Sequence, residues 1–167
     1  MKKAKEMAVK AIENLDLSRI KGKLMIPTSK GGKGWTEQEV DETEKWYKRF
    51  LILHAKYPGQ KIVPNGPIDT FWHQHILDTR KYGQDCEAVF GEMLHHYPYF
   101  GLNGDAETRD DAFEQTNQYY RIEFGEDCTN MFSKKKESVT AGSDAQKGVS
   151  CVSDGGNDEG SSGGGGD

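Results

Sequence analysis

The chain has 167 residues, enough for one domain of ordinary size. Its net charge of -5 offers no long-range attraction to phosphate backbones, so nucleic acid is not an expected partner. The first ten residues carry charge where a signal peptide needs an apolar run, and no later segment approaches membrane-spanning length. We therefore expect a cytoplasmic protein with no membrane partner. Neither a disulfide framework nor a zinc ribbon is indicated by the three cysteines, Cys86, Cys128 and Cys151.

Four main helices are predicted from apolar residues that recur at three- and four-residue spacing. They cover about residues 4–15, 37–57, 69–90 and 107–124. Thr36 and Glu39 form a capping-box pattern at the start of the second helix, and Gly125 is placed to cap the last one. No alternation typical of strands competes with these patterns. The sequence therefore predicts an all-α fold, a compact bundle of about four main helices around an aromatic-rich core.

The composition changes after Phe132. Residues 133–167 are rich in Lys, Ser, Gly and Asp, and such a segment cannot bury enough apolar surface to order itself. We therefore predict a helical domain over residues 1–132 and a disordered, glycine-rich tail over residues 133–167.

The segment from Asp69 to Tyr82, DTFWHQHILDTRKY, is the most informative part of the chain. On a helical wheel, His75 lies near the centre of a broad apolar face, whereas Asp69 and His73 lie on the other side, one turn apart. The two histidines of W-H-Q-H therefore point in nearly opposite directions. Gly83 is the expected place for this helix to kink or end. The apolar face also holds Trp72, Thr79, Tyr82 and Cys86.

A metal site is suggested because all five histidines lie between positions 54 and 96, with several aspartates among them. His95 and His96 are adjacent, so at least one of them can turn back toward the third helix. Nitrogen and oxygen ligands suit a divalent zinc, iron, manganese or copper ion. The candidate ligands are Asp69, His73, His75, His95 and His96, and the candidate pocket-lining residues are Trp72, Tyr82, Cys86, Tyr97 and Tyr99.

Each candidate also has a structural interpretation. His75 is equally suited to be a buried imidazole held by hydrogen bonds, and Asp69 with His73 to be an ordinary ion pair. Two functional hypotheses follow. The first is a His/Asp metal site, which would be enzymatic if it activates water or oxygen. The second is a non-catalytic protein-interaction module in which the W-H-x-H motif is a buried hydrogen-bond network. A small-molecule pocket lined by aromatic residues is a third. H-E-x-x-H and G-x-S-x-G are both absent, which disfavours the familiar hydrolases.

A wider pattern surrounds the W-H-x-H motif: a proline and an aspartate precede it, and a tyrosine, D-C and a glycine follow. The matching positions are Pro67, Asp69, Trp72, His73, His75, Tyr82, Asp85, Cys86 and Gly91. This pattern, with the later L-H-H-Y-P-Y-F-G, resembles the signature of the glycine-rich domain-containing protein-like family over about residues 35–125. The activity of that family is largely unassigned, so the resemblance implies a relative and no particular reaction.

Overall fold

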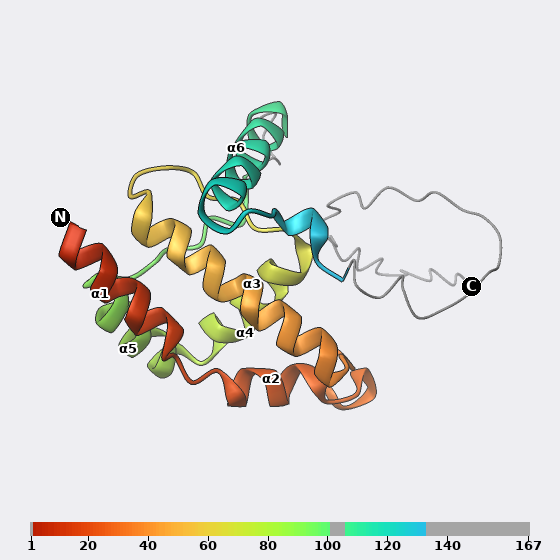
Figure 1. The fold of residues 1–167 in the computed structure, drawn as a ribbon. Helices are drawn as coiled ribbons and strands as arrows, with labels where there is room; N and C mark the ends of the chain where they lie inside the picture. The colour runs from red at the N-terminus through yellow and green to blue at the C-terminus, as the bar shows by residue number, and fades with distance from the viewer. Residues whose placement is uncertain (1, 101–105, 133–167) are drawn as a thin grey trace, which may run out of the picture.

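The computed structural model describes residues 2–100 and 106–132, and its regular elements there are helices (Figure 1). The six α-helices are α1 (Lys2–Glu13), α2 (Ser18–Met25), α3 (Glu37–Lys56), α4 (Gly66–Leu77), α5 (Thr79–Phe90) and α6 (Ala106–Phe124). Two short 3₁₀ helices cover Thr28–Lys30 and Cys128–Asn130. The predicted tail, residues 133–167, lies outside the described residues. Among the helices of the described part, none has the length and apolar character needed to cross a membrane.

Helix α3 forms the centre of the fold. Figure 1 shows it in the middle of the molecule, with α1, α2 and α5 to one side and α6 to the other. It packs against α1, α2, α4 and α6, and α4 in turn contacts α2 and α5. The large side chains of α3 are fully buried because they face these neighbours on several sides at once: Trp46, Tyr47, Phe50 and Leu53. The helices confirm the predicted helical fold class. The buried aromatic side chains of α3 give α4 a rigid surface to pack against.

The predicted start of the second helix is confirmed in detail. The Thr36 hydroxyl accepts a hydrogen bond from the Glu39 backbone N–H at 3.2 Å, and the Glu39 carboxylate accepts one from the Thr36 backbone N–H at 2.9 Å. Two otherwise unpaired amides are thereby satisfied. At the end of α6, Gly125 has a φ of 74°, the left-handed conformation predicted for a helix cap.

The predicted number of helices was wrong, because the structure has six α-helices in its described residues where the sequence pattern indicated about four. The expected third helix is divided at Asp78, and not at Gly83, which lies inside α5. Asp78 has a φ of -83° and a ψ of 70°, and its carboxylate accepts a hydrogen bond from the Lys81 backbone N–H at 3.3 Å. One residue thus ends α4 and caps α5. Thr79, expected on the apolar face, is exposed because α5 starts in a new direction.

Helix α2 was also missed, since it has only eight residues and contains a glycine. Its buried side chains, Ile20 and Leu24, are one turn apart, and the Asp16 carboxylate accepts a hydrogen bond from the Ser18 backbone N–H at 3.0 Å. Tertiary packing of one short apolar stripe therefore stabilises a helix that its own length could not.

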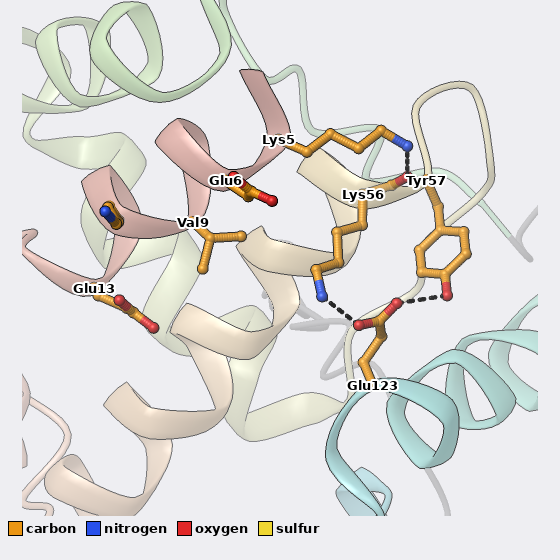
Figure 2. Close-up of a pocket in the computed structure, with 8 residues that line it drawn as sticks. Lys5, Glu6, Val9, Glu13, Lys56, Tyr57 and Glu123 are labelled. Atoms are coloured by element: carbon orange, nitrogen blue, oxygen red, sulfur yellow. Dashed lines mark hydrogen bonds and ion pairs between the residues drawn. The ribbon is translucent and has the colours of Figure 1, made fainter. Parts of the chain in front are cut away.

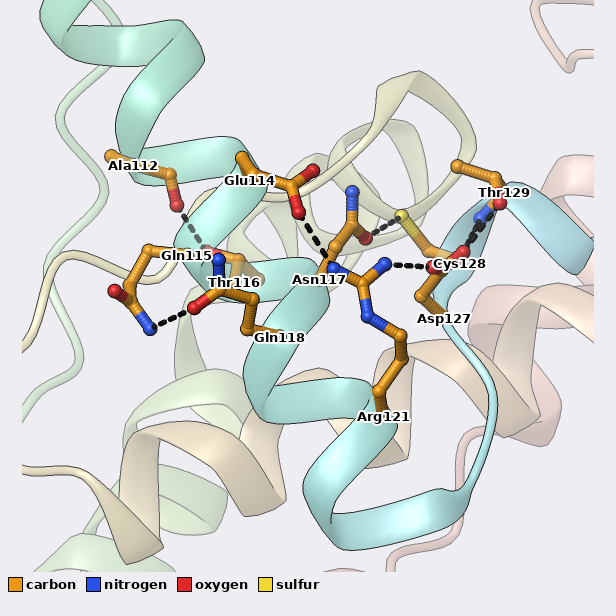
Figure 3. Close-up of polar contacts among 10 residues, drawn as sticks. All are labelled: Ala112, Glu114, Gln115, Thr116, Asn117, Gln118, Arg121, Asp127, Cys128 and Thr129. Atoms are coloured by element: carbon orange, nitrogen blue, oxygen red, sulfur yellow. Dashed lines mark hydrogen bonds and ion pairs between the residues drawn. The ribbon is translucent and has the colours of Figure 1, made fainter.

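The segment after α6 folds back against the domain (Figure 3). Arg121 of α6 contacts both Glu114 and Asp127, and the Cys128 thiol lies 3.1 Å from Oδ1 of Asn117. Asn65 then connects this segment to α4. Its Oδ1 caps α4 by accepting from the Ile68 N–H at 3.1 Å, while its Nδ2 lies 3.0 Å from the sulfur of Met131. The N-terminus of α4 is therefore fixed from two directions.

Candidate metal centre

Two of the candidate ligands lie on the exposed side of α4. Asp69 and His73 are four residues apart, so the helix places their side chains next to each other. Nδ1 of His73 lies 3.2 Å from Oδ2 of Asp69 and 2.8 Å from the Asp69 main-chain oxygen. The Asp69 and His73 side chains are 37% and 51% exposed. This pair is therefore accessible to solvent while its helix is anchored in the core.

The third residue of the cluster comes from the loop after α5. Gly91 ends α5 with a φ of 73°, and the chain then turns back toward α4. Nε2 of His96 lies 2.9 Å from Oδ1 of Asp69, and the rings of His73 and His96 are 4.5 Å apart, centroid to centroid. The Asp69 carboxylate thus lies between two imidazoles. We call Asp69, His73 and His96 the DHH cluster.

The spacing of the DHH cluster is compatible with a metal ion. One donor atom from each residue lies within 4.8 Å of the other two. Two ligands on a tetrahedral zinc ion with bonds of about 2.1 Å lie about 3.4 Å apart. The two carboxylate-to-imidazole distances, 2.9 and 3.2 Å, are already close to that value. The three side chains are therefore already close together, on α4 and on the loop after α5.

His75 is not part of the cluster. It is 1% exposed, its Nδ1 lies 2.9 Å from the Tyr47 hydroxyl, and its Nε2 lies 3.0 Å from Oδ2 of Asp85. Burial lowers the pKa of His75, and the Asp85 carboxylate opposes this shift. A neutral imidazole has one donor and one acceptor, so Nε2–H donates to Asp85 and Nδ1 accepts from Tyr47. Both ring nitrogens are therefore used in a structural network, which Lys81 extends by an ion pair with Asp85 at 2.8 Å.

The predicted pocket-lining residues do not gather in one place. Trp72, Tyr82 and Cys86 are buried, whereas Tyr97 and Tyr99 are 64% and 57% exposed. Tyr82 and Cys86 line a cavity of about 10 Å³ next to His75, which has room for no more than one water molecule. His95 is exposed and lies outside the DHH cluster.

Sequence patterns did not identify the partners of His75. Tyr47 lies on α3, and Asp85 lies on α5, the helix that follows the break at Asp78. The one available signal was that a buried histidine needs hydrogen-bond partners. It could not indicate which residues supply them, because Tyr47 is 28 positions away in the chain.

A hollow of about 580 Å³ lies between α1, the end of α3 and α6 (Figure 2). One ion pair and two hydrogen bonds join the residues that line it. Lys56 pairs with Glu123, which also accepts a hydrogen bond from the Tyr57 hydroxyl at 2.8 Å, and Lys5 donates to the Lys56 main-chain oxygen at 2.6 Å. These contacts fasten α1 and α6 to α3. The hollow contains no histidine or cysteine, so the DHH cluster remains the candidate site.

The fold and the cluster together define a small helical domain that presents two histidines and an aspartate at its surface. The chain belongs to the UCP032817-like family, an uncharacterised family whose model matches residues 11–138. This match overturns the resemblance to the glycine-rich domain-containing protein-like family, which rested on the W-H-x-H, D-C and H-H-x-P patterns and on a similar tail. The chain has no significant match among curated proteins or among solved structures.

Proposed function

We propose that this protein binds one divalent transition-metal ion through Asp69, His73 and His96. The observation that supports the proposal is the convergence of these three side chains, from α4 and from the loop after α5, to within 4.8 Å. Two imidazoles and a carboxylate form the ligand set of many zinc and non-haem iron(II) sites. Magnesium and calcium prefer oxygen ligands, so the set favours a transition metal.

A site with three protein ligands leaves coordination positions for water, oxygen or a substrate. The exposure of Asp69 and His73 supports this view, since small molecules can reach the ion from solvent. When bound, the ion would supply a Lewis acid or a redox centre. Asp69 would contribute one negative charge, and His73 and His96 would hold the ion as neutral donors.

Metal analysis of the purified full chain tests the proposal. The expected result is about one zinc or iron ion per chain, or uptake of added Co²⁺ by the metal-free protein with visible absorption bands. His73→Ala and His96→Ala should each abolish uptake. His95→Ala is the matched control, because His95 is adjacent to His96 but lies outside the cluster, and it should bind metal as the unmodified protein does. No stoichiometric metal and no cobalt spectrum would contradict the proposal.

A non-catalytic interaction module is the second candidate function. The observation in its favour is the exposure of Tyr97 and Tyr99 on the loop that follows His96, since tyrosines are enriched at protein interfaces. A double variant, Tyr97→Ser with Tyr99→Ser, tests whether the exposed tyrosines and the metal site are independent of each other. It should leave metal uptake unchanged if the loop serves only partners, and a loss of uptake would show that these tyrosines belong to the metal site.

A further inference from the structure

His96 differs from the other two residues of the DHH cluster because no helix holds it. Asp69 and His73 are fixed by α4, whereas His96 lies in a loop six residues beyond Phe90, the last residue of α5. A metal ligand binds tightly only when neighbouring groups fix its orientation before the metal arrives. The loop from Gly91 to His96 therefore needs its own anchor.

Tyr82 of α5 provides a direct anchor. Its hydroxyl donates a hydrogen bond to the main-chain oxygen of Leu94 at 2.5 Å, two residues before His96. The same hydroxyl accepts a hydrogen bond from Nε1–H of Trp72 at 2.9 Å. Tyr82 and Trp72 are 5% and 4% exposed, so water competes little for either bond. The loop is thus tied to two helices through one hydroxyl group.

Trp72 also contacts the ligand itself. Its ring lies 4.5 Å from the ring of His96, centroid to centroid, with the planes tilted by 45°. Trp72 directly precedes His73 in α4, so the helix that presents two ligands outward also presents the ring against which the third ligand packs. His96 is only 14% exposed as a result of this packing.

We propose that Tyr82 and Trp72 are positioning residues, which hold the loop so that His96 reaches Asp69 in the geometry that a metal requires. This inference rests on the proposed metal-binding function. Neither residue would touch the ion. Tyr82 acts through the Leu94 carbonyl and Trp72 acts through the His96 ring.

The test compares two tyrosine-to-phenylalanine variants of the full chain by titrating the metal-free proteins with Zn²⁺ or Co²⁺. Tyr82→Phe removes the hydroxyl that holds Leu94, and we expect roughly 10- to 100-fold weaker binding, the usual effect of losing a group that orients a ligand. Tyr47→Phe is the matched control. It removes another buried hydroxyl, which bonds to His75 and not to the loop, so it should lower the melting temperature but leave the affinity within about twofold.

Circular dichroism on both variants establishes that the helices are retained. A Tyr82→Phe protein that binds metal as tightly as the unmodified chain would overturn the positioning role and leave the proposed function intact. An equal loss of affinity in Tyr47→Phe would also overturn it, since the cause would then be general destabilisation. If the unmodified chain binds no metal, the proposed function fails, and the positioning role fails with it.

Discussion

His73 and His75 are two positions apart on α4, but the His73 side chain is 51% exposed and the His75 side chain is 2% exposed. One histidine faces solvent beside Asp69, and the other is enclosed between Tyr47 and Asp85. The W-H-x-H motif therefore has two separate roles in this fold. Its inward half, Trp72 and His75, belongs to buried hydrogen-bond networks, and its outward half belongs to the DHH cluster.

Substitution of His75 should mainly lower stability, whereas substitution of His73 should mainly abolish metal uptake. His75→Ala leaves a cavity and a buried Tyr47 hydroxyl without its partner, so we expect the free energy of unfolding to fall by about 2–4 kcal/mol. His73→Ala removes an exposed side chain, so the loss should stay below about 0.5 kcal/mol, while metal uptake is abolished. Urea denaturation measures the first quantity and cobalt titration the second. Equal destabilisation by the two variants would contradict this division.

The free energy of unfolding should depend on pH because His54 is buried. It is packed against Phe50 with its Nε2 lacking a hydrogen-bond partner among the described residues, and burial lowers its pKa to about 4. In the unfolded chain the pKa returns to about 6.5. Between these values the unfolded state binds more protons, so the free energy of unfolding falls as the pH drops, by on the order of 3 kcal/mol in total. Above about pH 7, where His54 is largely neutral in both states, this residue contributes little pH dependence.

His54→Leu checks this prediction, because leucine has a similar volume and does not titrate. The difference in melting temperature between the variant and the unmodified chain should be constant above pH 7 and grow in favour of the variant toward pH 4.5. His75 titrates in both proteins, so its contribution cancels in the comparison. Parallel profiles over the whole range would show that His54 is not the group responsible.

Asp78 should be important for the junction between α4 and α5. Its carboxylate accepts a hydrogen bond from the Lys81 backbone N–H, as a helix N-cap does. Asp78→Ala should lower the free energy of unfolding by about 1 kcal/mol, whereas Asp78→Asn keeps an acceptor and should cost only a few tenths. Urea denaturation of both variants provides the measurement. Equal losses would show that the charge of Asp78, and not its capping bond, stabilises the junction.

The helix caps and side-chain contacts that join residues a few positions apart were predicted correctly from the sequence. The capping box of Thr36 and Glu39 and the glycine cap at position 125 each involve atoms a few positions apart. Asp69 and His73 meet for the same reason, since a single helical turn brings them together. The break at Asp78 could not be predicted, because the wheel assumed one straight helix and an aspartate at the start of a polar run is common.

The third residue of the DHH cluster could not be predicted from its sequence neighbours. His95 and His96 are chemically identical and adjacent, and the sequence left open which of them turns toward α4. The answer depends on the Tyr82 hydroxyl, on the Trp72 ring and on the left-handed Gly91, which act together only in the folded chain. Tertiary packing therefore determines that His96, and not His95, joins the DHH cluster.

Removing metal with a chelator should leave the protein folded. The core is built from α3 side chains such as Trp46 and Phe50, and the DHH cluster lies outside it on the exposed side of α4. At a free zinc concentration one hundred times the dissociation constant, binding should stabilise the native state by about 2.7 kcal/mol, or roughly 10 °C for a domain of this size. A chelator should reverse that shift while the far-ultraviolet circular dichroism stays the same. His96→Ala should show neither shift, and His95→Ala should show both. Loss of helical signal on chelation would mean that the metal is required for folding, contrary to the position of the cluster outside the core.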